Sequence, residues 1–196
     1  MKYRAILLVG APGVGKGTQG KALGQLPGFY HCACGDVFRT LDMSSEIGRV
    51  FAEYSARGEL VPDHLTVELW LQRLRQLEHS GDWRPASDIL VLDGIPRNRS
   101  QAKILDEYAD VLRVIELVCH DRETLVRRIR GRALKSNRLD DANEAVIRRR
   151  LDVFDREVEG LLGHYPASIR RRISADQPAV LVLGDIIQVI REVVER

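Results

Sequence analysis

Short apolar runs alternate along this chain with longer stretches in which apolar residues recur every three or four positions. The short runs predict β-strands, at Tyr3–Val9, Phe29–Ala33, Ile89–Leu92, Leu112–Val118 and Arg171–Ser174. The longer stretches predict helices, at Gly15–Leu26, Ser45–Arg57, Asp63–Glu78, Ser100–Glu107, Arg122–Arg130, Asn143–Gly163 and Ala179–Val194. Strands that alternate with helices favour an α/β fold, in which helices cover a parallel sheet.

Two segments do not fit a simple alternation of strand and helix. Asp36 to Asp63 contains two helical stretches, which is more than one crossover between strands requires. Gly131 to Ala142 is polar and helix-poor, and it lies between two predicted helices. We expect both segments to be small excursions from a single core, and excursions over a sheet edge are where lids are found.

Composition places the chain among ordinary soluble proteins. Its 196 residues are 44% hydrophobic and 30% charged, enough for one domain with a real core. The formal net charge of +2 means that any basic character that matters is local. Three cysteines form no disulfide framework and indicate a reducing compartment.

The N-terminus has two basic residues before an apolar stretch, as a signal peptide has. That stretch, Ala5 to Val9, is shorter than the roughly 7–15 apolar residues that a signal peptide needs. No run approaches the ~18 apolar residues of a membrane span. We therefore expect a cytoplasmic protein.

Five glycines lie between Gly10 and Gly20, directly after the first predicted strand. Gly10, Gly15 and Lys16 match G-x-x-x-x-G-K, the pattern of a phosphate-binding loop. Without Cβ atoms, the backbone N–H groups of such a loop can surround a phosphate, and the following helix adds its positive end. A glycine-rich turn with a chance lysine is the alternative, but the strand before the loop and the helix after it favour phosphate binding.

An acidic residue and an arginine follow the third predicted strand, in the run LDGIPRNRSQA. Asp93 ends that strand beside the first strand, where a carboxylate can hold water on a Mg²⁺ ion bound to nucleotide phosphates. Arg97 leaves the turn with a planar guanidinium that suits a phosphate. Taken alone, the run is equally compatible with a simple turn and a surface salt bridge.

Arginines are concentrated between Arg127 and Arg150. A nucleic-acid surface would explain this, but no aromatic residues are interleaved for stacking and the net charge is low. Phosphoryl transfer explains it better, because guanidinium groups can neutralise charge on the transferring group. Arg148 has the spacing of a surface ion-pair ladder, whereas Arg150 is in line with Val146 and Phe154 and is expected to face a cleft.

The run GAPGVGKGTQ, from Gly10 to Gln19, resembles the phosphate loop of the adenylate kinases and related nucleoside monophosphate kinases. Gly17 occupies the position where most such loops have Ser or Thr, and the hydroxyl comes one residue later as Thr18. Further runs resemble that family in the same order over nearly the whole chain: CGDVFR from Cys34, GELVPD from Gly58, DGIPRNRSQ from Asp93 and RIRGR from Arg128.

This resemblance implies a fold and a domain organisation. The fold is a P-loop NTPase-type five-stranded parallel sheet with helices on both faces. The whole chain, 1–196, is one kinase domain, with a helical insert for the nucleoside monophosphate at about 33–62 and a short lid at about 131–142. The lid contains no cysteine or histidine, so no structural zinc site is expected.

The resemblance also implies the reaction Mg·ATP + AMP ⇌ 2 ADP, with no covalent intermediate, and assigns residues to it. The implied ATP-binding residues are Gly13, Val14, Gly15, Lys16, Gly17, Thr18, Arg128, Arg132 and Gln177. The implied AMP-binding residues are Cys34, Gly35, Arg39, Glu59, Leu60, Val61, Gly94, Ile95, Pro96, Arg97, Gln101, Arg138 and Arg150, with Gln101 reading the adenine edge. The implied catalytic residues are Lys16, Arg97, Arg132, Arg138 and Arg150. Thr18 and Asp93 are the implied Mg²⁺ contacts, through water.

Three positions depart from the family pattern. Cys34 stands where a threonine or serine hydroxyl normally contacts the base, and a thiol is a weaker donor and acceptor. Ile95 replaces a usual aromatic residue, and the Asp-Gly usual near Gln177 is absent. The departure at Cys34 most weakens the expectation of base selectivity, whereas Ile95 is expected to alter packing rather than chemistry.

Three other functions are compatible with a phosphate loop. A UMP/CMP kinase of the same family shares every phosphate-handling feature; Gln101 favours AMP, whereas Cys34 weakens that preference. A nucleotide-binding regulator without turnover would be distinguished by an activity assay. A GTPase switch is disfavoured because the chain has no N-K-x-D motif. We expect a monomer, because both nucleotides fit one chain. We also expect that it binds neither nucleic acid nor membrane.

Overall fold

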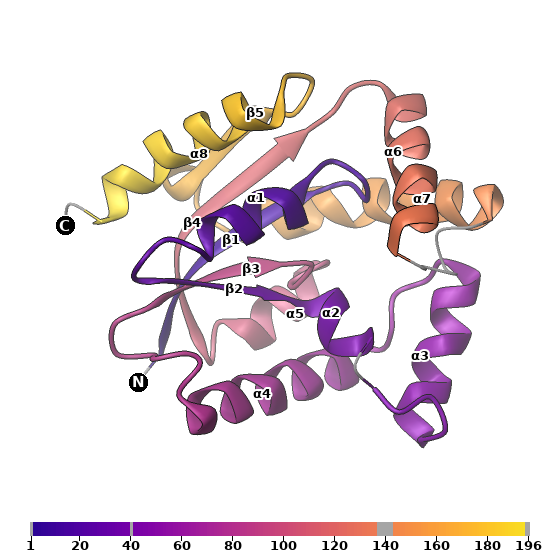
Figure 1. Cartoon of the computed structure of the whole chain (residues 1–196), viewed down its shortest axis with the longest axis horizontal. Helices are drawn as coiled ribbons and strands as arrows, with labels where there is room; N and C mark the ends of the chain where they lie inside the picture. Colours follow the sequence, from indigo (N-terminus) through magenta and orange to yellow (C-terminus); the bar gives the residue numbers. More distant parts are fainter. Residues whose placement is uncertain (1, 40, 137–142, 195–196) are drawn as a thin grey trace.

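The computed structural model describes residues 2–39, 41–136 and 143–194, and within them five strands form one parallel sheet. The strand order is β2-β3-β1-β4-β5 (Figure 1). The strands are β1 (Tyr3–Gly10), β2 (Phe29–Ala33), β3 (Ile89–Asp93), β4 (Ala109–Val118) and β5 (Arg170–Ser174). All four neighbouring pairs are parallel, which confirms the α/β fold predicted from the sequence.

Helices cover both faces of this sheet, as Figure 1 shows. One face packs against α1 (Lys16–Leu23), α6 (Arg122–Ser136) and α8 (Ala179–Val194). The other packs against α4 (Asp63–Ser80) and α5 (Arg99–Leu105). The remaining helices are α2 (Cys34–Arg39), α3 (Glu46–Arg57), α7 (Glu144–Leu162) and the 3-10 helix η2 (Ala167–Ile169). Helix α7 contributes buried residues to the cores on both faces.

Alternate residues of β1 belong to two separate apolar cores. Ala5, Leu7 and Val9 pack with the buried residues of α4 and α5, whereas Ile6 and Leu8 pack with those of α1, α6 and α8. All five are at most 5% exposed. A strand buried on both faces needs an apolar residue at every position, which explains why the sequence has a continuous run there rather than an alternating one.

The central position of β1 predicts a ligand site at the carboxyl ends of the strands. The chain passes from β1 to β2 and β3 on one side, and later to β4 and β5 on the other. In open parallel sheets, ligands bind beyond the carboxyl ends of the strands at the point where the strand order reverses. Here that point is the end of β1, next to the end of β3.

Most predicted elements are confirmed, with shifted ends. The strand β4 begins at Ala109 rather than Leu112, because its first residues pair with β1 from Tyr3 onward. The two helical stretches expected between Asp36 and Asp63 are α2 and α3, although α2 begins earlier, at Cys34.

The segment from Gly131 to Ala142 was expected to be helix-poor, and this is wrong for its first half. Helix α6 continues to Ser136, through alanine, leucine and lysine, which are good helix formers. Residues 137–142 lie outside the described part of the chain.

Among residues 2–39, 41–136 and 143–194, no helix combines the length and the apolar character that crossing a membrane requires.

Helix α1 approaches β2 closely at two glycines. A Cβ atom on Gly20 would lie 2.3 Å from Nε2 of His31, a β2 residue. A Cβ atom on Gly24 would lie 2.7 Å from the Cβ of His31 and 3.0 Å from its backbone nitrogen. At Gly24 a side chain would therefore press on the backbone of β2, whereas at Gly20 the obstacle is the imidazole ring of His31.

We expect Gly24→Ala to lower the free energy of unfolding by about 1–3 kcal/mol, because the new methyl group would push on the backbone of β2. The matched control is Gly184→Ala on the exposed side of α8, where a new Cβ would have no atom within 4 Å. That change should raise stability by up to about 1 kcal/mol, since alanine has the higher helix propensity. Urea unfolding curves of both variants measure the two effects, and equal effects would contradict the packing described here.

Candidate active site

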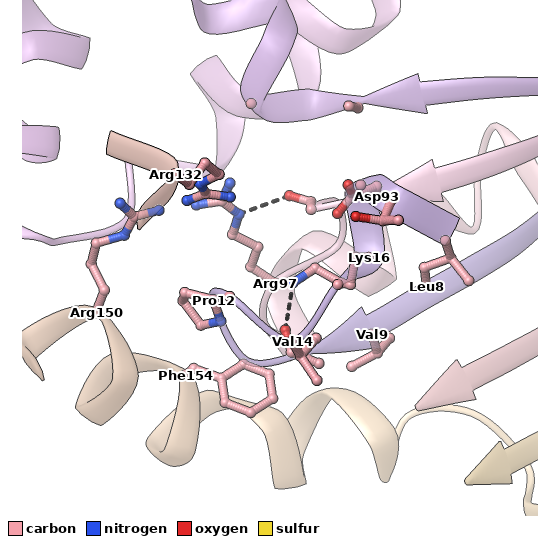
Figure 2. A pocket seen from close by; sticks show the side chains of 18 of the residues that line it. Leu8, Val9, Pro12, Val14, Lys16, Asp93, Arg97, Arg132, Arg150 and Phe154 are labelled. Atoms are coloured by element: carbon pink, nitrogen blue, oxygen red, sulfur yellow. Dashed lines mark hydrogen bonds between the residues drawn. The ribbon is translucent and has the colours of Figure 1, made fainter. Parts of the chain in front are cut away.

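A cleft of about 810 Å³ opens at the carboxyl ends of the strands. Its floor is the loop between β1 and α1 (Figure 2). Its walls come from helices α6 and α7, from the ends of β2 and β3, and from the segments that follow α3 and β5. The cleft therefore lies where the strand order reverses. Every motif singled out in the sequence contributes to it.

The loop from Gly10 to Lys16 has the backbone of a phosphate-binding loop. Gly13 and Gly15 have φ angles of +81° and +114°, which residues with a side chain rarely adopt. The carbonyl of Gly15 accepts hydrogen bonds from the backbone N–H groups of Thr18 and Gln19, so α1 starts directly at the loop. The N-terminus of α1 and the loop amides thus face the same space, as anion binding requires.

The ammonium group of Lys16 is held by the loop itself. Its Nζ donates to the carbonyl oxygens of Gly10, at 2.7 Å, and Ala11, at 3.2 Å; Figure 2 shows the first of these bonds. Burial lowers the pKa of Lys16 to about 8, against the opposing effect of Asp93. The positive charges of Arg97, Arg132 and Arg150 contribute to this lowering. A bound polyanion would stabilise the protonated ammonium and so oppose this shift.

The carboxylate of Asp93 lies at the end of β3, beside Leu8 of β1, as the sequence predicted. Its side chain is 15% exposed. Burial raises the pKa of Asp93, but the neighbouring His31 and the charges of Lys16 and Arg97 outweigh burial, and the net pKa is lowered. The group is therefore a carboxylate at neutral pH, in contact with the same space as the phosphate loop.

The guanidinium groups of Arg97, Arg132 and Arg150 point into one part of the cleft (Figure 2). They come from the loop after β3, from α6 and from α7. Nε of Arg97 donates to the carbonyl of Gly94 at 2.8 Å, which fixes the direction of its side chain. The expectation that Arg150 faces a cleft is confirmed. A region with this much positive charge around a buried lysine favours a ligand with several negative charges.

Arg148, two residues before Arg150, lies on the outside of α7. It pairs with Glu144, as predicted, and with Glu123 of α6. Asp152, the other member expected in the ladder, pairs with Arg122 instead. Arg148 therefore belongs to the surface.

Most of the residues expected in the site line the cleft: Gly13, Val14, Gly15, Lys16, Gly17, Thr18, Gly35, Glu59, Leu60, Val61, Asp93, Gly94, Pro96, Arg97, Arg128, Arg132, Arg150 and Gln177. Three others, Cys34, Ile95 and Gln101, are buried behind the lining, each at most 2% exposed. The side chain of Arg39, at the end of α2, and the whole of Arg138 lie outside the described part of the chain.

Cys34 is a buried neutral thiol in this structure. Burial raises the pKa of Cys34 to about 11; the charge of Arg97 has a smaller lowering effect and that of Asp93 a smaller raising effect. A buried thiol offers only a weak donor and a weak acceptor. If a base binds near this position, its hydrogen bonds must come mainly from other groups.

The segment after β5 meets α6 and α8 at the far end of the cleft. The guanidinium of Arg128 makes two long contacts, of 3.4 Å and 3.5 Å, with the carbonyl oxygen of Ala175. The side-chain amide of Gln177 donates to the carbonyl of Ser174 and to the carboxylate of Asp185. Both cleft-lining side chains are thus held by neighbouring groups at this end of the cleft.

Near the acceptor side, the carboxylate of Glu59 connects two elements. It accepts from Arg57 at the end of α3, at 3.0 Å, and from Arg149 of α7, at 2.6 Å. This side chain therefore ties the segment after α3 to α7. The peptide bond between Ile95 and Pro96, on the opposite wall, is cis.

Sequence reasoning missed His31. This side chain lines the cleft, is 10% exposed, and places Nε2 3.8 Å from the Asp93 carboxylate, which is beyond hydrogen-bond distance. The available signal was a pair of glycines four residues apart, Gly20 of α1 and Gly24 directly after its end. Glycines at that spacing mark a helix face that another segment approaches closely.

Comparison with known proteins agrees with this site. The family model described as adenylate kinase matches residues 8–170. The adenylate kinase of Kocuria rhizophila is 37% identical over 165 residues, covering 82% of this chain and 84% of its own length. That of Synechococcus sp. strain RCC307 is 39% identical over 172 residues, covering 84% and 85%. That of Thermus thermophilus is 37% identical over 169 residues, covering 84% of both.

The match includes the phosphate loop, the segments of Cys34, Gly58 and Asp93, and the arginines of α6 and α7. It spans every wall of the cleft except the segment after β5. The chain therefore belongs to the adenylate kinase family, which makes it a nucleoside monophosphate kinase.

Proposed function

We propose that the protein transfers the terminal phosphoryl group of Mg·ATP reversibly to AMP, giving two molecules of ADP. The observation that carries this proposal is the meeting of Lys16 with Arg97, Arg132 and Arg150 above the phosphate loop, with Asp93 beside them. Two nucleotides with their phosphates end to end present the clustered negative charge that this arrangement favours.

On the donor side, the loop amides from Gly13 to Thr18 and the ammonium of Lys16 would hold the ATP phosphates. Arg128, Arg132 and Gln177 line the part of the cleft that would take the rest of ATP. On the acceptor side, the proposed AMP contacts are Cys34, Gly35, Arg39, Glu59, Leu60, Val61, Gly94, Ile95, Pro96, Arg97, Gln101, Arg138 and Arg150.

The residues present fit a magnesium ion that arrives with the nucleotide. The carboxylate of Asp93 and the hydroxyl of Thr18 are oxygen donors on the same rim of the cleft, and Mg²⁺ prefers oxygen. In the described part of the chain, no three His, Cys, Asp or Glu residues form a group that would hold a metal by themselves. One carboxylate combined with substrate phosphates and water is a common way to bind Mg²⁺, and the ion neutralises phosphate charge there.

Catalysis would consist of alignment and charge neutralisation. A phosphoryl group in transfer spreads its charge over its equatorial oxygens, and no general base is required. Lys16, Arg97, Arg132, Arg138 and Arg150 would surround this charge with positively charged donors. Closure of the insert, about 33–62, and of the lid, about 131–142, would exclude water and suppress hydrolysis of ATP. We also propose that the enzyme works in the cytoplasm as a monomer, since both substrates fit one chain.

The function is tested first by a coupled assay with Mg·ATP and the acceptors AMP, dAMP, CMP, UMP and GMP. We expect AMP to be the preferred acceptor. A preference for UMP or CMP would keep the phosphate chemistry and overturn the substrate. Tight ATP binding with no transfer to any acceptor would point to a regulator instead.

Arg97→Ala should lower kcat/KM for AMP by about 100-fold or more, because it removes a charged donor aimed at the acceptor phosphate. Affinity for ATP should stay close to that of the wild type. The matched control is Arg148→Ala, which removes an arginine that pairs with Glu123 and Glu144 on the surface of α7. Steady-state kinetics and equilibrium ATP binding measure both variants. If Arg97→Ala weakened the binding of ATP and AMP equally, the assignment of Arg97 to the acceptor side would be wrong.

ATP affinity should decrease as the pH rises above about 8, the pKa of Lys16 in the free enzyme. Bound phosphates stabilise the protonated ammonium, so at higher pH binding must take up a proton. The association constant then falls by up to about tenfold per pH unit. Isothermal titration calorimetry between pH 7 and 10, in buffers of different ionisation enthalpy, measures the affinity and the proton uptake. Lys16→Arg should give a flat profile over this range, because a guanidinium does not lose its proton there.

A further inference from the structure

The side-chain amide of Gln101 is held at both of its ends. Its Oε1 accepts from the backbone N–H of Arg97 at 2.8 Å, and its Nε2 donates to Oδ1 of Asp63 at 2.9 Å. The residue is 1% exposed, directly behind the cleft wall formed by Gly94, Pro96 and Arg97. The proposed reader of the base is therefore fixed before any nucleotide binds.

Asp63 is itself held in place from the same side. Nδ2 of Asn98 donates to Oδ1 of Asp63 at 2.9 Å, while Oδ1 of Asn98 accepts from the backbone N–H of Gln101 at 2.8 Å and caps α5. Asp63 is the first residue of α4, so these bonds join the starts of two helices. The carboxylate of Asp63 cannot turn away from Gln101 without also losing its hydrogen bond from Asn98.

These partners determine which end of the amide is oxygen and which is nitrogen. A backbone N–H only donates, and a carboxylate only accepts. If the amide of Gln101 turned over, its NH₂ would face the N–H of Arg97 and its oxygen would face the carboxylate of Asp63. Both hydrogen bonds would be lost and like charges would meet at each end, so one orientation is favoured.

The hydrogen bonds that Gln101 can still make follow from the number of donors and acceptors on its side-chain amide. An amide has two N–H groups and two oxygen lone pairs, and one of each is used. One donor and one acceptor remain, in a fixed order. The adenine edge offers an acceptor at N1 next to a donor at its 6-amino group. Hypoxanthine and guanine offer a donor at N1 next to an acceptor at O6, which is the reverse order.

We propose that Asp63 is a positioning residue that sets acceptor specificity: by fixing the amide of Gln101, it selects 6-amino purine monophosphates over 6-oxo purine monophosphates. This inference rests on the proposed function, in which AMP is the acceptor and Gln101 contacts its base. The departure at Cys34 adds to the importance of Gln101. The buried thiol is a weak hydrogen-bonding group, so the amide carries a larger share of base recognition.

The test is Asp63→Asn, which keeps the shape of the side chain but offers either an oxygen or an NH₂ to Gln101. The substrates are AMP and IMP, which differ at N1 and C6 of the base and share the ribose and the phosphate. We expect the ratio of kcat/KM for AMP to that for IMP to fall by about tenfold or more, since a charge-assisted bond no longer opposes reversal of the amide. Uniform damage to the enzyme would leave this ratio unchanged.

The matched control is Glu68→Gln, the same carboxylate-to-amide change on the exposed side of α4. This control should keep the wild-type ratio. If Asp63→Asn fails to fold by thermal unfolding, Asp63→Ser replaces it, because a serine hydroxyl also accepts or donates and suits the first turn of a helix.

The outcomes separate the two proposals. If the wild type prefers AMP to IMP but Asp63→Asn keeps the full ratio, the role of Asp63 is wrong and the proposed function stands. If Asp63→Asn loses activity on both substrates equally, Gln101 serves only to hold the backbone of Arg97, and the specificity role is again wrong. If the wild type transfers no phosphoryl group to AMP, both proposals fall.

Discussion

The parallel pairing of β1 with β3 on one side and β4 on the other is the constraint on which the rest of the structure depends. It buries β1 on both faces, so the strand has no freedom to shift its register without moving apolar residues out of two cores. The register places Leu8 beside Asp93 and brings the glycine loop to the same edge. Backbone pairing thus places the carboxylate beside the start of the loop, and the loop carbonyls of Gly10 and Ala11 then hold the ammonium of Lys16.

The cost of this arrangement is an excess of positive charge around a buried lysine. Three arginines approach from three different elements, while Asp93 is the carboxylate that acts on Lys16 from within the described part of the site. These charges and burial lower the pKa of Lys16, and a polyanionic ligand would oppose that lowering. The protein therefore gives up stability in the free state in exchange for charge complementarity in the complex, which is typical of preorganised sites.

Periodicity and motif spacing predicted the sheet, the order of the helices and the orientation of Arg150, because each depends on local pattern. What they did not predict depends on contacts between distant segments. The continuation of α6 past Gly131 is decided by residue propensities that the polar composition concealed. The approach of His31 to α1 depends on Gly20 and Gly24, and nothing in the sequence of β2 itself indicates that contact. The bond between Gln101 and Asp63 joins residues 38 positions apart, so no local pattern could reveal it.

Helix α7 carries three consecutive arginines with three different surroundings. Arg148 pairs on the surface, Arg149 reaches Glu59 beside α3, and Arg150 points into the cleft. Each residue turns an α-helix by about 100°. A one-residue insertion or deletion between the start of α7 and Arg148 would therefore rotate all three away from their positions at once. A substitution at one of these sites changes the contacts of one arginine, whereas a change of length alters the contacts of all three. We therefore expect α7 to vary among related chains in sequence and not in length.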